Sequence, residues 1–450
     1  MNKKYSLFVL IVFTFCLSYR SSFSQPKIDT TAHWTTHFQS TVVYQHQSAF
    51  KANYSGPNSL DTLANEAYSQ TSTLFIGRKL WKGASLYFNP EISGGQGISN
   101  VLGLAGAANG EIYRVGNPKP TLFVARAFLQ QNISLRNTDY ESQKDDLNQL
   151  ADKIPTSRIT ISIGKFCMSD FFDDNNYNHD ARSQFLNWSL MAHGSWDFPA
   201  DLRGYTTGFV VELIKPKWVI RLSAVRVPRK ANGLQMDWNI VKGNSETLEY
   251  ERKWFIHNLP GVLRATTYVT FSKAPIYKKA IYELQNGDST RYKIINGSAE
   301  WNTYEGVKYG FGLNAEQEIS NGVGVFARLN WSDGHSGDWA FTEIDRNLQL
   351  GLNLNGKLWN RPDDVFGVAT AINGLSPDHR AYFKAGGIGF IIGDGNINYG
   401  TENIIEAFYK ANITKFLAIS LDYQYITNPA YNKDRSGPIH IPGVRVHVQF

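Results

Sequence analysis

The sequence predicts an all-β chain that closes into a transmembrane antiparallel β-barrel of about sixteen strands, with eighteen as the alternative count. Three observations support this prediction. After the N-terminal apolar run, no segment approaches the roughly 18 consecutive apolar residues of a transmembrane helix. Aromatic residues make up 14% of the chain, although its mean hydropathy is −0.32. Apolar residues recur with a period of two, as in strands that bury one face.

The N-terminus has the three parts of a secretory signal peptide. Lys3 and Lys4 form a basic region, LFVLIVFTFCL at 7–17 is apolar, and SFS at 22–24 places small residues where a signal peptidase reads. We therefore expect residues 1–24 to be cleaved during export.

The rest of the chain, residues 25–450, is predicted to form a single barrel domain, because it contains no Pro- or Ser-rich linker. The signal peptide holds three basic and no acidic residues, so 42 basic and 39 acidic residues remain, a net charge of +3 instead of +6. So modest a charge on so long a chain does not favour nucleic-acid binding. Cys167 is the one cysteine left after cleavage, so the mature chain forms no internal disulfide.

The alternation of apolar and polar residues is clearest near the C-terminus. In NLQLGLNLN (347–355) the four leucines share one face of a strand and the polar residues share the other. FLAISLDYQYI (416–426) and VRVHVQF (444–450) repeat the pattern. Thirteen further runs begin near Trp34, Ser72, Ala84, Thr121, Arg158, Gly204, Lys217, Thr247, Val262, Tyr309, Gly322, Asp364 and Glu402.

The lengths of the connections favour a barrel over a soluble sandwich. Counting back from the C-terminus, short connections such as 412–415 and 320–322 alternate with long ones such as 373–401 and 274–308. Outer-membrane barrels have short periplasmic turns and long external loops, whereas a soluble sandwich has no reason for this asymmetry. The predicted periplasmic connection at 137–157 breaks the rhythm, because it is charged and rather long.

A closed barrel also predicts where charged strand residues point. Lipid cannot hydrogen-bond the backbone, so the sheet must close, and one face then meets lipid while the other meets water. A charge on the lipid face costs roughly 2–4 kcal/mol at mid-bilayer. The lumen face is therefore expected to hold Tyr87, Asn89, Glu91, Arg126, Arg221, Arg264, Arg328 and Glu406, and the lipid face Leu86, Phe88, Phe123, Ala125 and Ala127.

Several long segments, spread over nearly all of residues 25–450, resemble the carbohydrate-selective porins of the OprB type, and most of all those of Bacteroidetes-like Gram-negative bacteria. They are YSGPNSL (54–60), LYFNPEISGGQGIS (86–99), NGEIYRVGNPKPTLFVAR (109–126), GKFCMSDFFDDNNYNHDARSQFLNWSL (164–190), WDFPADLRGYTTG (196–208), GIGFIIGDG (387–395) and DYQYITNPAYN (422–432). The stretch 226–300 shares little of this resemblance. The family implies a sixteen-stranded barrel in the outer membrane through which small sugars diffuse down their gradient. We expect a monomer or homotrimer in outer-membrane lipid, with no cofactor.

A sugar-selective constriction needs two kinds of surface, because sugars have hydroxyl rims and apolar C–H faces. Arginine offers a rigid fork of donors, and a carboxylate accepts from hydroxyls. The candidates for the constriction are Glu91, Arg126 and Glu406 from strands, and Arg114, Asp173, Arg182, Trp188 and Arg203 from loop motifs shared with the family. For the loop residues, tying an infolded loop to the wall through ion pairs is an equal alternative.

The run DFFDDNNYNHD (170–180) lies in the predicted external connection 168–203. Its oxygen-rich side chains suggest calcium ligands, paired catalytic carboxylates or a solvated loop, but the EF-hand spacing is absent. The calcium candidates are Asp173, Asp174, Asn176 and Asp180. Aromatic residues such as Phe171 and Tyr177 would be wasted on a free loop, so we infer that the segment folds into the barrel and narrows the pore.

Two other functions stay open beside the channel. The first is an outer-membrane or secreted β-rich hydrolase acting on carbohydrate or lipid, and the second is a surface adhesin with a plugged lumen. The chain contains neither G-x-S-x-G nor H-E-x-x-H, and no separated pair of carboxylates has clear roles. We therefore predict a channel rather than an enzyme. The glycine-rich stretch 94–110 lacks the G-K-[ST] ending of a phosphate loop and is expected to pack inside the barrel.

Overall fold

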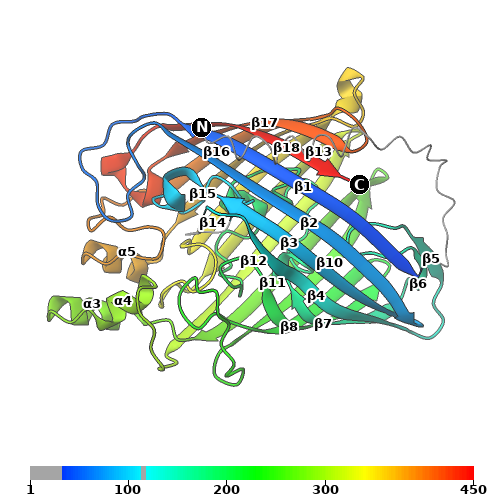
Figure 1. Ribbon diagram of the computed structural model, residues 1–450, viewed down its shortest axis with the longest axis horizontal. Coiled ribbons are helices and arrows are strands. Elements are labelled where there is room, and N and C mark those ends of the chain that lie inside the picture. The colour runs from blue at the N-terminus through cyan, green and yellow to red at the C-terminus, as the bar shows by residue number, and fades with distance from the viewer. Residues whose placement is uncertain (1–32, 113–117) are drawn as a thin grey trace.

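Sixteen strands close into one antiparallel barrel in the computed structural model, which describes residues 33–112 and 118–450. Each strand pairs with its neighbours in the barrel, and β1 pairs with β18 to complete the ring (Figure 1). The predicted fold class and the count of sixteen are confirmed. The segment 1–24 and Arg114 lie outside the described residues. Within that described part, no helix is long and apolar enough to cross a membrane.

The barrel strands are β1 (Trp34–Gln47), β2 (Asn65–Trp81), β3 (Ala84–Gly95), β4 (Thr121–Ser134), β7 (Arg158–Phe166), β8 (Thr206–Lys215), β9 (Trp218–Arg226), β10 (Asn244–Ile256), β11 (Leu259–Ser272), β12 (Gly306–Ser320), β13 (Val323–Ser332), β14 (Arg346–Asn355), β15 (Val365–Gly374), β16 (Glu402–Asn412), β17 (Leu417–Thr427) and β18 (Ile439–Gln449). The connections hold the hairpin β5 (Tyr140–Gln143) and β6 (Asp152–Pro155), the helices α2 (Trp188–Met191), α3 (Tyr277–Gln285), α4 (Thr290–Ile295) and α5 (Pro377–Lys384), and five short 3₁₀ turns, η1 (Ile98–Val101), η2 (Met168–Asp170), η3 (Gly356–Trp359), η4 (Pro429–Tyr431) and η5 (Lys433–Arg435).

The two faces of the strands follow the predicted alternation. On β14, Leu350 is 50% exposed on the outer face, whereas the neighbouring Gln349 is fully buried on the inner one. On β3, Leu86 and Phe88 face outward while Tyr87, Asn89 and Glu91 are buried in the lumen. The outer band is apolar, as in barrels whose outer face meets lipid, and the polar inner face explains the negative mean hydropathy.

Strand β4 departs from simple alternation. Asn89 of β3 pairs with Arg126, but the next residue, Pro90, pairs with Val124, so Ala125 is an extra residue in a β-bulge. Such a bulge breaks the period of two. The extra residue shifts the alternation by one position, so odd-numbered residues point to the lumen before the bulge and even-numbered residues point there after it. Phe123 and Arg126 consequently both line the lumen cavity. The prediction that Phe123 faces lipid is wrong, while the lumen position of Arg126 is confirmed.

The connections differ at the two ends of the barrel as the sequence predicted. Helices α3, α4 and α5 gather at the end with the long loops, and the β5–β6 hairpin lies at the opposite end, which we expect to face the periplasm (Figure 1). The hairpin belongs to residues 135–157, called here the periplasmic insert. It accounts for the one long connection on the side of the short turns.

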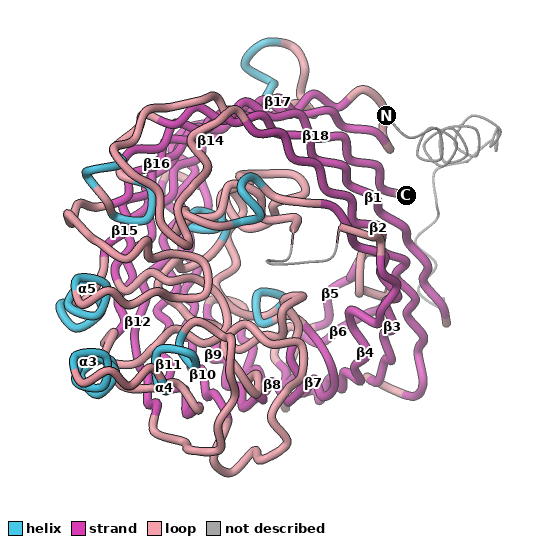
Figure 2. Tube along the Cα trace, turned by 60° about the vertical axis from the view of Figure 1, so that its left-hand side comes forward, coloured by secondary structure: helices cyan, strands magenta, loops and turns pink. Residues whose placement is uncertain are grey.

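Several of the long loops fold inward and occupy part of the lumen, and two of them carry segments expected to do so (Figure 2). The larger is residues 167–205 between β7 and β8, called here the infolded loop. The smaller is the glycine-rich stretch around 96–112, which packs against it: the backbone N–H of Trp188 donates to the carbonyl of Ala107 at 2.9 Å. A Cβ on Gly106 would lie 2.5 Å from Oγ of Ser189, so this close approach needs glycine. The expected inward packing of both segments is confirmed.

Candidate functional site

A cavity of about 760 Å³ remains in the lumen between the infolded loop and the wall formed by β1 to β4. Its lining comes from Gln39 on β1, Phe75 on β2, Glu91 on β3, Arg126 on β4 and much of the infolded loop. A solute inside the barrel therefore meets both strand and loop side chains.

One side of this cavity is a polar wall of four residues, Glu91, Glu111, Arg126 and Arg182. Nε and Nη2 of Arg126 donate to the two carboxylate oxygens of Asp170 at 2.7 and 2.6 Å. Nε of Arg182 donates to Glu111 at 2.9 Å, and its Nη2 donates to Glu91 at 3.3 Å. Each arginine is thus held by carboxylates, which fixes the direction of its remaining donors.

Arg182 and the neighbouring Tyr205 keep their protons at physiological pH. Burial lowers the pKa of the Arg182 guanidinium, but the carboxylates of Glu111 and Glu91 outweigh burial and raise it above its ordinary value. Burial raises the pKa of the Tyr205 hydroxyl well above its ordinary value, so it stays protonated. This hydroxyl donates to Glu91 at 3.2 Å. The wall therefore offers a fixed pattern of donors and acceptors.

Another part of the cavity lining is an aromatic wall of Trp188, Phe198 and Phe341. The rings of Trp188 and Phe341 stack with centroids 5.2 Å apart and planes 17° apart. Phe198 lies 4.2 Å from Phe341, centroid to centroid. Nε1 of Trp188 donates to the carbonyl of Asn109 at 2.8 Å, which ties the wall to the glycine-rich stretch.

The structure brings five of the eight candidate residues to this cavity: Glu91, Arg126, Arg182, Trp188 and Arg203. The guanidinium of Arg203 lies over the ring of Phe123, 4.2 Å from its centroid. Asp173 and Glu406 are fully buried and are not among the residues that line it. Arg114 lies outside the described residues.

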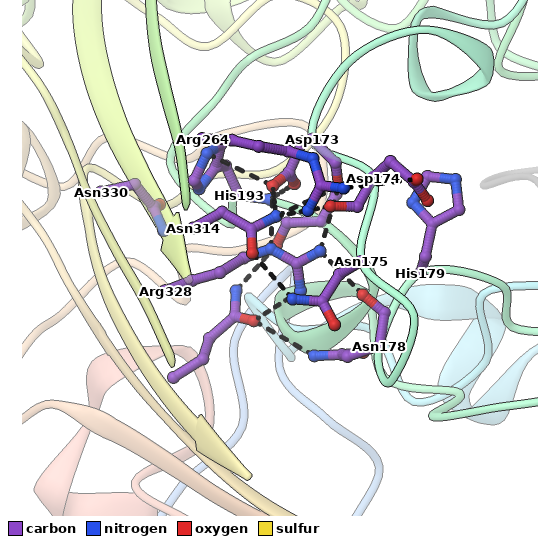
Figure 3. Close-up of polar contacts among 12 residues, drawn as sticks. Asp173, Asp174, Asn175, Asn178, His179, His193, Arg264, Asn314, Arg328 and Asn330 are labelled. Atoms are coloured by element: carbon purple, nitrogen blue, oxygen red, sulfur yellow. Dashed lines mark hydrogen bonds and ion pairs between the residues drawn. The ribbon is translucent and has the colours of Figure 1, made fainter. Parts of the chain in front are cut away.

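Asp173 anchors the infolded loop to the barrel wall (Figure 3). Its Oδ1 accepts from Nε of Arg328 on β13 at 2.9 Å and from Nδ2 of Asn314 on β12 at 2.6 Å. Its Oδ2 accepts from the backbone N–H of His193 in the same loop at 2.6 Å. Burial raises the pKa of Asp173, but Arg328 and His193 outweigh it and hold the pKa below its ordinary value. Asp173 thus ties the infolded loop to the barrel wall, which was the alternative role considered for the loop candidates.

Glu406 and Glu402, both on β16, hold the two inward loops by their backbones. Glu406 accepts from the N–H groups of Leu186 and Asn187 at 2.5 and 2.9 Å. Glu402 accepts from the N–H groups of Ala105 and Gly106 at 2.9 and 2.8 Å. These buried carboxylates replace the water that loop amides would otherwise bind.

The four calcium candidates make separate contacts with protein groups. Asp173 pairs with Arg328, Asp174 lies 3.5 Å from Arg264, Nδ2 of Asn176 donates to Glu316, and Oδ1 of Asp180 accepts from the backbone N–H of Arg182. Asp173, Asp174 and Asn176 thus contact the barrel wall, and Asp180 bonds within the loop itself.

Elsewhere in the described part of the chain, Asp338, Glu343 and His379 offer donor atoms within 4.8 Å of one another. This cluster lies among the external loops, and protein groups already engage it. The ammonium of Lys308 contacts Asp338, backbone N–H groups such as that of Ile391 donate to Glu343, and Nδ1 of His379 lies 3.0 Å from Asp345. The cluster links the loops after β13 and β15.

Three cavity residues, Phe198, Phe341 and Tyr205, were not among the sequence candidates. Phe198 and Tyr205 lie inside the family-like segment WDFPADLRGYTTG. That resemblance was the sequence feature that could have identified them. Phe341 lies in no such segment, and it reaches Trp188 only because the loop after β13 folds across the lumen.

Comparison with known proteins places the chain in a family. A model described as "Carbohydrate-selective porin, OprB family" matches residues 59–450. Porin AaxA of Chlamydia muridarum is 20% identical over 301 residues, which cover 66% of this chain and 54% of that protein. Porin AaxA of Chlamydia pneumoniae is 23% identical over 301 residues, which cover 66% of this chain and 57% of that protein. The chain thus spans little more than half the length of these curated relatives.

Among solved structures, the high-pH structure of Pseudomonas putida OprB matches with a TM-score of 0.69 and 16% identity, covering 93% of this chain and 94% of that one. At this identity the match shows a shared fold. The match of the family model over residues 59–450, together with the sixteen-stranded barrel, shows that the chain belongs to the OprB family of carbohydrate-selective porins.

Proposed function

We propose that the protein is an outer-membrane channel through which small sugars diffuse passively down their gradient. The observation that supports this function best is the pairing of a polar wall with an aromatic wall around one water-accessible cavity. The family description points to the same class of solute. A channel is favoured over a hydrolase because the cavity residues act as fixed donors, acceptors and stacking surfaces.

The polar wall is suited to hydroxyl groups. Arg126 and Arg182 are oriented by carboxylates. Their N–H groups on the cavity side can donate to a sugar, while Glu91 and Glu111 accept from it. Because the charges of the wall are nearly balanced, an uncharged solute gains hydrogen bonds without meeting a strong single-sign field. Weak, multiple contacts of this kind let a solute enter and leave again.

The aromatic wall supplies the complementary surface. The parts of the Trp188 and Phe341 rings that line the cavity offer an apolar surface for the C–H face of a pyranose ring. Recognition in the cavity would then use the hydroxyl rim and the apolar C–H face of the sugar together. No cofactor is required for passive diffusion.

The proposed function also requires that the protein is exported and inserted into the outer membrane. The signal peptide 1–24 is expected to be removed, and the apolar outer face of residues such as Leu350 and Leu421 is expected to contact outer-membrane lipid. The barrel is proposed to act as a monomer or homotrimer, with each protomer containing its own pore.

A planar-bilayer recording of the purified protein tests this function. Addition of glucose is expected to reduce the ion current in a concentration-dependent way, because the sugar occupies the cavity. Conductance that no sugar reduces would identify a general porin, and the absence of any conductance would refute the channel. An adhesin with a plugged lumen predicts the last result.

A further inference from the structure

The periplasmic insert, residues 135–157, lies at the end of the barrel opposite helices α3 to α5 (Figure 1). It leaves the wall between β4 and β7, yet Asp152 pairs with Lys79 of β2 at 2.8 Å. Further along, Oδ1 of Asp145 lies 3.3 Å from Nε2 of His37 on β1. The insert thus reaches past β3 to β2 and β1, where an ion pair with Lys79 and a polar contact with His37 hold it.

The tip of the insert is rigid. The N–H of Asp146 donates to the carbonyl of Gln149, and the N–H of Gln149 donates back to Asp146, both at 3.0 Å. Asn148 in this turn has a φ of +51°, a left-handed conformation that asparagine tolerates better than most residues. Leu150, next to the turn, is 3% exposed and belongs to the same buried cluster as Tyr87 and Phe128. The tip is therefore packed against the lumen wall.

The tip borders two water-accessible spaces. Asn148 and Gln149 line the main cavity of about 760 Å³. The same two residues line a second cavity of about 250 Å³, which lies against β7 to β10. Polar and charged side chains such as Arg158, Arg221 and Lys253 complete the lining of this second cavity.

We propose that the periplasmic insert forms a second constriction of the pore, on the exit side of the sugar cavity. Asn148 and Gln149 are its specificity-determining residues. Nδ2 of Asn148 can donate to a hydroxyl-bearing solute, and the amide oxygen of Gln149, whose Nε2 already donates to the carbonyl of Lys144 at 2.8 Å, can accept from one. This inference rests on the proposed function, since it concerns the solute that crosses the main cavity. A solute is then selected twice, first between the polar and aromatic walls and then at the tip.

Removal of the insert provides the sharpest test. The N–H of Thr156 already donates to the carbonyl of Asp139 at 2.9 Å, so a deletion of residues 140–155 closed by Gly-Gly joins neighbouring ends. If two constrictions of similar resistance act in series, single-channel conductance rises about twofold in the deletion variant. Heat-modifiable migration on a detergent gel verifies that the barrel has formed.

Two point variants test the named residues without removing the insert. Asn148→Gly tolerates the positive φ and removes only the amide, and Gln149→Ala keeps the backbone bonds of the turn. Both are expected to change the on-rate of glucose added from the periplasmic side several-fold, and to leave the on-rate from the external side unchanged. The matched control is Asn258→Gly, since Asn258 has a φ of +65° in the turn between β10 and β11 and lines neither cavity.

The outcomes separate this inference from the proposed function. If the unmodified protein shows no glucose block, the sugar-channel function fails whatever the insert does. If the unmodified protein is blocked by glucose, and all three variants keep its conductance and its periplasmic on-rate, the second constriction is refuted. A higher conductance in the deletion variant with side-dependent kinetics in the point variants supports it.

Discussion

Nε of Arg328 on β13 donates to Oδ1 of Asp173 in the infolded loop at 2.9 Å, and both side chains are exposed by 1% or less. The two residues are 155 positions apart. This contact fixes the first part of the infolded loop to the wall opposite β1 to β4, and so helps to decide how much of the lumen stays open.

Asp173→Ala is therefore expected to release the loop and leave the barrel intact. Removal of one partner from a buried ion pair leaves the other charge uncompensated and costs about 3–5 kcal/mol. The loop should become mobile, so single-channel conductance rises and sugar preference falls. Glu300→Ala is the matched control, because its carboxylate pairs with Arg229 at 3.0 Å, its side chain is 42% exposed, and it does not line the cavity. A folded Asp173→Ala protein with unchanged conductance would show that the other anchors suffice.

Acidification is expected to weaken the same anchor through His193. Burial is the main cause that lowers the pKa of His193 from 6.5 to about 4. Between these pH values the unfolded or detached loop binds more protons than the docked one, so the contribution to stability is complete above pH 6.5 and falls as the pH approaches 4. The loss reaches about 3 kcal/mol.

The measurement is the thermal midpoint of the protein in detergent from pH 7.5 to 4.5. His193→Phe removes the titrating group, so its midpoint should depend less on pH in this window. An equal pH dependence in the two proteins would assign the effect to other groups.

Two variants of Arg182 distinguish the effect of its positive charge on sugar binding from the effect of its planar geometry. Hydrogen bonds to charged groups contribute about 1.5–3 kcal/mol, so Arg182→Gln should weaken glucose block at least tenfold. Arg182→Lys keeps the charge but loses the planar fork that reaches Glu91 and Glu111, so it should also weaken the block, by less. Arg229→Gln, in an exposed pair with Glu300, is the control that should leave the block constant unchanged.

Trp188 tests the aromatic wall. Trp188→Ala removes the ring that stacks on Phe341 and should weaken glucose binding by about 1 kcal/mol. Trp188→Phe keeps an aromatic face and loses the bond to Asn109, so it should retain more of the affinity. Trp238→Ala changes an 82% exposed external residue and serves as the control. Equal sugar block in all three variants would exclude stacking as a source of selectivity.

The strands were predictable because lipid and water impose opposite demands on successive residues. Arg264, Arg328 and Glu406 were assigned to the lumen from parity alone, and all three are buried there. Asn89 and Arg126 kept this parity, whereas Phe123 did not. The bulge at Ala125 leaves no mark in the order of apolar and polar residues, so alternation alone could not reveal it.

The candidate site was predictable only in part, because loops bring together residues that are far apart in the chain. Family-like segments pointed to Arg182, Trp188 and Arg203, which line the cavity. The same reasoning placed Asp173 in the constriction, although its partners on β12 and β13 bury it. No local pattern identifies those partners, since they become neighbours only when the barrel closes.

The seam between β1 and β18 has a consequence for assembly. Thr41 and His447 form a hydrogen-bonding contact at 2.8 Å across this seam, although 406 positions separate them. Bringing such distant segments together costs about 5 kcal/mol of chain entropy, and until it happens both outer strands expose unpaired backbone groups that hydrocarbon cannot satisfy. A partly built sheet is thus poorly suited to the bilayer and prone to pair with other chains. Insertion should accordingly be nearly all-or-none, with the nascent edges shielded until the first and last strands meet.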